Sequence, residues 1–137
     1  MTAKLFVLGS YITDMMMRTP RLPRRGETIF AGPFQVGPGG KGSNQAVAAR
    51  RAGAQVMFTT RLGDDDLGRS ARRMFEAEGI DARFTITDCK GVATGAALIM
   101  VEEGSGENMI TVAIGACAHF SDAEVVRAIL QSLEAEA

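Results

Sequence analysis

The chain has 137 residues, of which 46% are hydrophobic, and a formal net charge of −1. This is the size of one domain with a real core, and the balanced charge gives no general attraction to nucleic acid or to an acidic membrane. Two cysteines, Cys89 and Cys117, and one histidine, His119, have no paired-ligand spacing, which excludes a disulfide framework and a zinc site. This cysteine usage favours a cytoplasmic compartment, and no apolar run approaches the length of a membrane span.

The first apolar segment, residues 5–8, ends at a Gly-Ser pair and has the composition of a buried parallel strand. Asp14 lies just beyond it. Ligands of open α/β sheets gather outside the carboxyl ends of the strands, so Asp14 is a candidate site residue, with turn capping as the alternative. Residues 15–18 and 28–36 have extended character and flank a turn-rich segment, which predicts two antiparallel strands.

Residues 37–45, GPGGKGSNQ, combine backbone freedom with one cation and one amide. Glycines let the main chain adopt positive φ and approach a ligand closely. Ser43 is predicted to cap a helix over residues 44–52. Lys41, Asn44 and the free amides of the first helical turn then point at one spot, which suits an anion or a cluster of hydroxyls.

Other interpretations of this segment were weighed against a polar ligand site. Three of the glycines spell the dinucleotide pattern G-x-G-x-x-G, with acids at 64–66 about twenty residues later, but the pattern does not directly follow the first strand. A Walker-type phosphate loop is excluded, because position 35 is Gln and Gly42 follows Lys41. A glycine-rich turn that only lets a small-faced helix pack on a sheet is the structural alternative.

The middle of the chain alternates strand and helix patterns. Residues 55–60 predict a second parallel strand, residues 67–78 an amphipathic helix capped by Asp66, and residues 83–87 a third strand. The acids at 64–66 are expected to favour the positive end of that helix rather than to bind a metal. The β-α-β order predicts an α/β fold.

Two β-rich runs, at 94–101 and 108–114, are joined by a glycine-containing turn and predict an antiparallel hairpin. Its apolar content indicates that one face is covered by a ligand or another chain. Ser121 and Glu124 then form a capping box for a last helix. Five large apolar residues are predicted on the inner side of this helix: Val125, Val126, Ile129, Leu130 and Leu133.

Five motifs stand in a familiar order: GSYITD at 9–14, RRGET at 24–28, GGKGSNQA at 39–46, GDDDLG at 63–68 and TGAALIMV at 94–101. Together they resemble the amino-terminal half of ribokinase-like members of the PfkB carbohydrate kinase family. The resemblance implies a doubly wound α/β domain over residues 1–137 with a small β-sheet lid, whose strands lie near 15–36 and 94–114. It also implies transfer of the ATP γ-phosphate to a primary sugar hydroxyl, with Mg²⁺ and optionally a monovalent cation, in a homodimer formed through the lids.

The resemblance also assigns site residues. The sugar would be held by five of them: Asp14, Gly40, Lys41, Gly42 and Asn44. A carboxylate accepts hydrogen bonds from adjacent hydroxyls, a lysine donates them and an amide does both, so the chemistry agrees. Ala97, Ile110 and Val112 would form an apolar cover that excludes water. No catalytic or metal-binding residue is expected in this chain.

The chain departs from the family pattern in three ways. The family's catalytic aspartate and nucleotide pocket have no counterpart in this sequence, so the chain alone is expected to be inactive. Ile12, which belongs to the expected site, stands where ribokinases carry Asn. An apolar residue there disfavours ribose and favours a sugar without that hydroxyl, such as 2-deoxyribose. Cys117 replaces another usual Asn.

Two functional hypotheses follow from these patterns. The first is the sugar-binding half of an ATP-dependent pentose kinase. The second is a truncated, non-catalytic module for sugar binding or subunit association. The expected partners are a small-molecule sugar and a second copy of the chain in a homodimer, with neither nucleic acid nor a membrane.

Overall fold

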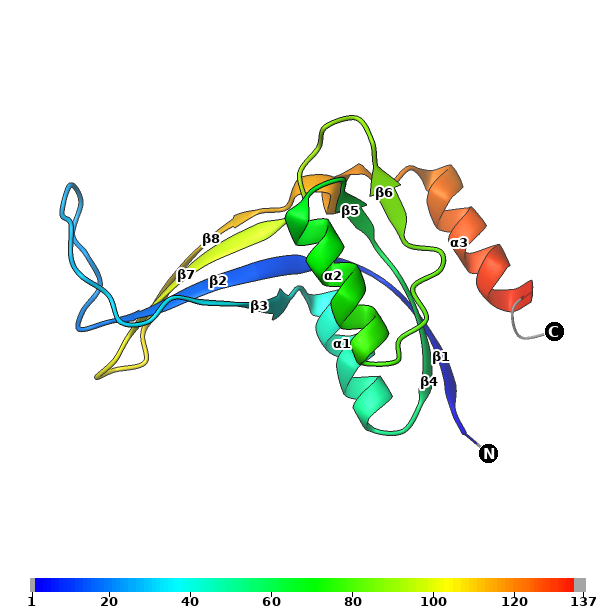
Figure 1. The fold of residues 1–137 in the computed structure, drawn as a ribbon, viewed down its shortest axis with the longest axis horizontal. Helices are drawn as coiled ribbons and strands as arrows, with labels where there is room; N and C mark the ends of the chain where they lie inside the picture. The colour runs from blue at the N-terminus through cyan, green and yellow to red at the C-terminus, as the bar shows by residue number, and fades with distance from the viewer. Residues whose placement is uncertain (1, 135–137) are drawn as a thin grey trace.

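The body of the molecule is built on two parallel strands. The computed structural model describes residues 2–134. β1 (Lys4–Leu8) and β4 (Gln55–Thr59) pair in parallel. α1 (Lys41–Arg51) lies on one side of this pair and α3 (Asp122–Glu134) on the other (Figure 1). Parallel strands with helices on both sides confirm the predicted doubly wound α/β class.

Further elements extend the body alongside β4. They are β5 (Arg61–Gly63), α2 (Asp66–Ala77), β6 (Ile86–Asp88) and the short 3-10 helix η1 (Gly115–His119). β5 and β6 pair in parallel, so the strand predicted at 83–87 is shorter and begins later than expected. A turn, in which the amide of Thr85 donates to the carbonyl of Ala82, interrupts its first part.

Aromatic rings fill the centre between these layers. Phe58 of β4 and Phe75 of α2 are buried, and their ring centroids lie 5.2 Å apart at an interplanar angle of 83°. Tyr11, which directly precedes β2 (Ile12–Thr19), is also buried and meets Phe75 edge-on at 5.6 Å. Edge-to-face pairs of this kind add to the stabilisation from burial. They tie the segment that leads out of β1 to α2.

A four-stranded sheet projects from the body toward the left of Figure 1. Its order is β3-β2-β7-β8, with β3 (Gln35–Gly39), β7 (Ala96–Glu102) and β8 (Asn108–Ala113). β2 runs antiparallel to β3 and parallel to β7, and β7 and β8 form the predicted hairpin. The predicted antiparallel pairing of residues 15–18 with the next strand is confirmed by β2 and β3. The predicted bounds of that next strand, 28–36, are wrong, because a loop precedes β3, which begins at Gln35.

The helix predicted at 44–52 begins at Lys41. Its N-cap is Gly40, whose φ of 93° lies in the left-handed region that favours glycine and turns β3 directly into the helix. Ser43 is therefore not the cap but lies inside the first turn. Its buried hydroxyl donates to the carbonyl of Gly39 at 2.6 Å.

The second helix has an acidic cap, displaced by one residue from the prediction. Asp65, not Asp66, is the N-cap of α2, because its carboxylate accepts from the amide of Gly68 at 2.8 Å. Asp66 lies in the first turn with a side chain that is 97% exposed. α2 buries Ala71 and Phe75, as its amphipathic pattern predicted.

α3 begins with the predicted capping box. The amide of Ser121 donates to the Glu124 carboxylate at 2.8 Å, and the amide of Glu124 donates to the Ser121 hydroxyl at 3.3 Å. The predicted inner side is wrong, because the helix buries its small residues Ala128 and Ser132. Four of the five large apolar residues are instead 44–60% exposed: Val126, Ile129, Leu130 and Leu133.

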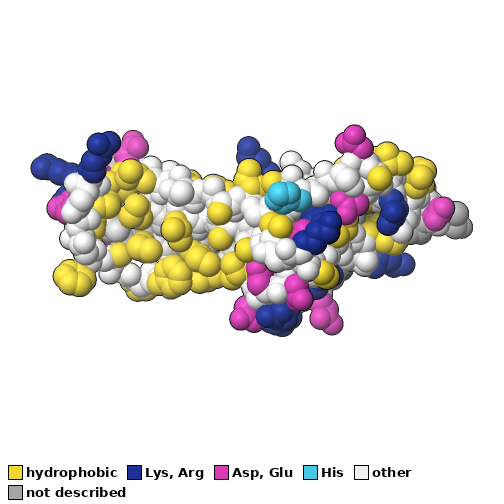
Figure 2. Space-filling model, turned by 90° about the horizontal axis from the view of Figure 1, so that it is seen from above, with side chains coloured by type: hydrophobic (Ala, Val, Ile, Leu, Met, Phe, Trp, Pro, Cys, Tyr) yellow, Lys and Arg dark blue, Asp and Glu magenta, His cyan; other side chains and the backbone are white. Residues whose placement is uncertain are grey.

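Apolar side chains are also exposed on the projecting sheet, where Figure 2 shows many hydrophobic groups. Leu98, Ile110 and Val112 are 50–55% exposed. In the body, β1 was predicted to be buried, but Leu5 is exposed, because β1 pairs with β4 alone among the strands of residues 2–134. Exposed apolar side chains grouped in this way form a candidate contact surface.

Candidate functional site

A cleft of about 580 Å³ lies between the projecting sheet and the start of α1. β2, β7 and β8 supply its wall. The residues that line it are Ser10, Ile12, Asp14, Gly40, Lys41, Asn44, Ala97, Ile99, Ile110, Val112 and Ile114. Eight of the nine residues expected at the site therefore line one cleft, and the exception is Gly42.

The strand register explains why three strands share this wall. Asp14 of β2 lies opposite Ala97 of β7, which in turn lies opposite Val112 of β8. Residues directly opposite each other point to the same side of a sheet, and the next residue on that side is two positions along. Ile99 and Ile110 therefore continue the same apolar wall toward the tip of the sheet.

Asp14 is the acidic group among the lining residues. Burial raises the pKa of its carboxyl above the ordinary value. Gly39 on the neighbouring strand makes room for it, because a Cβ at Gly39 would overlap the carboxyl group. Gly39 was expected to provide backbone freedom. In the structure it leaves space for the Asp14 side chain.

The start of α1 forms the other side of the cleft. A Cβ at Gly40 would lie 2.7 Å from the carbonyl oxygen of Ser10 and 2.8 Å from the amide nitrogen of Ile12, so a side chain does not fit there. Lys41 and Asn44 follow in the first turn and are exposed to the cleft. They bring an ammonium donor and an amide that both donates and accepts.

Gly42 lies behind the cleft, against the end of β1. A Cβ at Gly42 would lie 2.7 Å from the Cα of Gly9. The next amide, of Ser43, donates to the carbonyl of Ser10 at 3.1 Å. Gly42 therefore lets α1 approach the connection between β1 and β2, and the helix start reaches the cleft as a result.

Three lining residues were not assigned to the site from the sequence: Ser10, Ile99 and Ile114. Ser10 follows the carboxyl end of β1, where the general rule for α/β sheets could have found it. Ile99 is two positions from Ala97 in a strand and thus on the same face. Ile114 lies just beyond the end of β8, but it belongs to the predicted run 108–114 and is two positions from Val112, so strand alternation could have found it.

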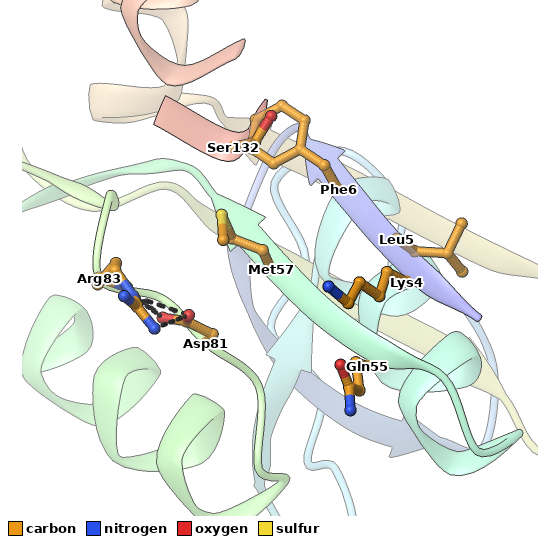
Figure 3. Close-up of a pocket in the computed structure, with 8 residues that line it drawn as sticks. All are labelled: Lys4, Leu5, Phe6, Gln55, Met57, Asp81, Arg83 and Ser132. Atoms are coloured by element: carbon orange, nitrogen blue, oxygen red, sulfur yellow. Dashed lines mark hydrogen bonds and ion pairs between the residues drawn. The ribbon is translucent and has the colours of Figure 1, made fainter. Parts of the chain in front are cut away.

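A second hollow, of about 200 Å³, lies over β1 and β4 on the side of α3 (Figure 3). Lys4, Phe6 and Met57 line it, together with the ion pair between Asp81 and Arg83. None of the expected site residues borders it. It lies where α3 covers the two strands only in part.

Cys117 lies behind the cleft wall. Its half-buried thiol donates to the carbonyl of Tyr11 at 3.1 Å, next to Ile12. Cys117 and the exposed Cys89 are both free thiols. Within residues 2–134, no group of three or more His, Cys, Asp or Glu side chains is placed to hold a metal ion. The same part of the chain contains no helix whose length and apolar content would let it cross a membrane.

Comparison with known proteins identifies the family. The model of the pfkB family carbohydrate kinases matches residues 2–136. The chain belongs to this family. Ribokinase from Haemophilus influenzae is 41% identical to it and deoxyribokinase from Salmonella typhi 35%, each over 122 residues. Each of these alignments covers 89% of this chain and 39% of the relative.

Solved structures show the same relationship in three dimensions. Ribokinase from Giardia lamblia matches with a TM-score of 0.80 and 34% identity, over 91% of this chain and 37% of that protein. Ribokinase from Arabidopsis thaliana, solved with ribose and ATP, matches with a TM-score of 0.69 and 32% identity, over 85% of this chain and 37% of that one. The chain thus has the ribokinase fold and spans about two fifths of the length of these relatives.

Proposed function

We propose that this chain supplies the sugar-binding part of an ATP-dependent kinase that phosphorylates the primary hydroxyl of a pentose. The observation that carries the proposal is the cleft, in which Asp14, Lys41 and Asn44 lie beside an apolar wall. Membership of a carbohydrate kinase family supports it. Because the chain spans about two fifths of its relatives, the proposal concerns its share of the reaction, which is to hold the sugar.

Each polar group has a distinct role toward a sugar. The Asp14 carboxylate accepts hydrogen bonds from two adjacent hydroxyls, Lys41 donates to sugar oxygens, and Asn44 does both. Together they fix the orientation of a small ring, which brings its primary hydroxyl to one place. Ala97 and Val112 cover the sugar and exclude water, so that the phosphoryl group passes to the sugar rather than to solvent.

ATP with Mg²⁺ is the proposed phosphoryl donor, optionally with a monovalent cation. The solved ribokinases from Cryptococcus neoformans, in complex with ADP, and from Arabidopsis thaliana, in complex with ribose and ATP, support this choice. The bound nucleotide supplies the γ-phosphoryl group. The share of this chain is proposed to be the sugar contacts, and the catalytic base is proposed to lie in the part of the relatives that the chain does not span.

Ile12 supports 2-deoxyribose as the preferred pentose. Its side chain is 7% exposed and lines the cleft. An apolar group offers no partner to a sugar hydroxyl, and a buried hydroxyl left without one costs about 1–3 kcal/mol. The relatives include both a deoxyribokinase and ribokinases, so both sugars belong in the test.

Association of two copies through the projecting sheets is also proposed. Ile110 and Val112 are exposed on the cleft face, and Val36 and Leu98 on the opposite face. Exposed apolar faces of this kind are typical of subunit contacts. A module that binds sugar and associates without catalysis is the second candidate function, and the exposed apolar faces of the projecting sheet favour it.

The test measures ADP release by the complete protein made from its gene, with ATP, Mg²⁺ and a panel of pentoses and deoxypentoses. Asp14→Asn is expected to lose most activity, because it removes the charged acceptor. Asp81→Asn is the matched control, because its carboxylate pairs with Arg83 away from the cleft. Absence of ADP with every pentose would contradict the kinase proposal. Calorimetric sugar binding without turnover would support the second candidate.

A further inference from the structure

Thr94, which lies two residues before β7, is hydrogen-bonded to the start of α2. Asp65 Oδ1 accepts from the amide of Gly68 at 2.8 Å and from the Thr94 hydroxyl at 2.7 Å. Asp65 Oδ2 accepts from the amide of Thr94 at 2.8 Å. The Thr94 oxygen in turn accepts from the amide of Gly63 at 2.9 Å. These four hydrogen bonds join β5 and the start of α2 to Thr94.

Capping of the helix explains only one of the four bonds. The bond from Gly68 satisfies an amide of the first turn of α2. The two bonds from Thr94 to Asp65 add nothing to the helix itself, and their effect is to hold residue 94 against it. Thr94 is buried, so water does not replace these partners. The packing is tight as well, since a Cβ at Gly63 would lie 2.6 Å from the amide nitrogen of Thr94.

The strand that follows Thr94 covers the cleft. The carbonyl of Gly95 accepts from the amide of Thr13 at 2.8 Å, which begins the pairing of β7 with β2. A Cβ at Gly95 would lie 2.5 Å from Cδ1 of Ile12, so this wall residue rests directly on Gly95. Ala97 follows two residues later in the same wall. A displacement of Thr94 is therefore passed to the cleft through β7.

We propose that Asp65 and Thr94 are positioning residues of the sugar site, which fix the projecting sheet over the cleft by anchoring the start of β7. Asp65 and Thr94 do not line the cleft. They affect it through Gly95, whose carbonyl begins the pairing of β7 with β2. That the ligand of the cleft is a sugar rests on the proposed function. The anchoring of β7 is measured without any ligand.

The experiment compares hydrogen exchange and sugar affinity in variants of the full chain. Thr94→Val keeps the shape of the side chain and removes the hydroxyl bonds to Asp65 and Gly63. Amides of β7 are then expected to exchange about tenfold faster, as the loss of one or two hydrogen bonds implies, and calorimetry with 2-deoxyribose should show weaker binding. Thr94→Ser restores the hydroxyl and should return both readouts to the wild-type values.

A matched control separates anchoring from helix capping. Ser121→Ala removes the hydroxyl that accepts from the amide of Glu124 in the capping box of α3, which has no bond to β7, and should speed exchange in α3 alone. Asp65→Asn keeps an acceptor for the amide of Gly68 and removes the acceptor for the amide of Thr94. It should therefore speed exchange in β7 more than in α2.

Wild-type exchange of β7 in folded Thr94→Val would overturn the proposal. If Thr94→Val does not fold, Asp65→Asn decides: faster exchange in β7 supports anchoring, and faster exchange in α2 alone overturns it. If the wild-type chain binds no sugar while β7 still responds to these substitutions, the anchoring stands and the sugar function fails.

Discussion

The Asp14 carboxylate occupies the space that a side chain at Gly39 would take. The two residues lie on the neighbouring strands β2 and β3, and Gly39 immediately precedes Gly40, which caps α1. One short segment therefore admits the acidic group of the cleft and starts the helix that faces it.

Gly39→Ala should displace the Asp14 carboxyl group and weaken sugar binding about tenfold or more, because hydrogen bonds to a charged group are lost. Gly37→Ala is the matched control on the same strand, since a Cβ there meets no atom within 4 Å. Calorimetric titration of both variants with ribose and 2-deoxyribose measures the effect. Equal affinities would contradict the assignment of Asp14 to the site.

Ile12→Asn should shift the ratio of kcat/KM for ribose to that for 2-deoxyribose upward by about tenfold, because the amide supplies a partner for the additional hydroxyl. Ile12→Val keeps the position apolar and should leave the ratio unchanged. Steady-state kinetics of the complete protein with both sugars gives the answer. An unchanged ratio in Ile12→Asn would remove Ile12 from the determinants of specificity.

Arg61 joins β6 and α3 to β5 through ion pairs with Asp88, at 2.9 Å, and Glu124, at 2.5 Å. Hydrogen bonds from the amide of Lys90 and from Arg61 hold the pKa of Asp88 below its usual range. Bonds from the amide and hydroxyl of Ser121, together with Arg61, lower the pKa of Glu124. A carboxylate with a lowered folded pKa stabilises the protein above its unfolded pKa, and this contribution is lost as pH falls through the folded value. The melting temperature should be steady from neutral pH to about pH 5 and fall below about pH 4.

Asp88→Asn should lower the melting temperature at neutral pH and flatten its decline in acid, because one of the two linked carboxylates is gone. Asp66→Asn is the control, since the exposed Asp66 pairs with the exposed Arg69 and its loss should change little. Thermal unfolding followed by circular dichroism between neutral and acid pH makes the comparison. A parallel decline in wild type and Asp88→Asn would exclude Asp88 as a source of the acid sensitivity.

Association through the projecting sheets predicts a mass that rises with concentration in light scattering. Leu98→Lys and Ile110→Lys place a charge on opposite faces of the sheet, and the variant that reverts to monomer identifies the contact face. A wild-type chain that stays monomeric at every concentration would contradict the proposal.

The wall of the cleft could be predicted because strand alternation is local. The family resemblance assigned Asp14 and Ala97 to one site, and the period of two then indicates which neighbouring strand residues share their face. The start of α1 could not be predicted in the same way. Its N-cap is a glycine in the left-handed region, whereas the pattern of preferred caps selected Ser43.

Contacts between distant segments explain the other differences. The bonds between Asp65 and Thr94 join residues far apart in the chain, and no local pattern reports such a pair. On α3, periodicity identifies an apolar stripe but not the surface that covers it, and Ala128 and Ser132 take the side against the body. The stripe at Leu130 and its neighbours therefore faces outward.

Tyr11 is the single tyrosine of the sequence, which contains no tryptophan. Its ring packs edge-on against Phe75, its backbone contacts the thiol of Cys117, and the next residue lines the cleft. The tyrosine emission of the polypeptide, excited at wavelengths where the seven phenylalanines do not absorb, therefore arises from one residue directly behind the cleft wall. Occupancy of the cleft can be followed optically through Tyr11, without an attached dye.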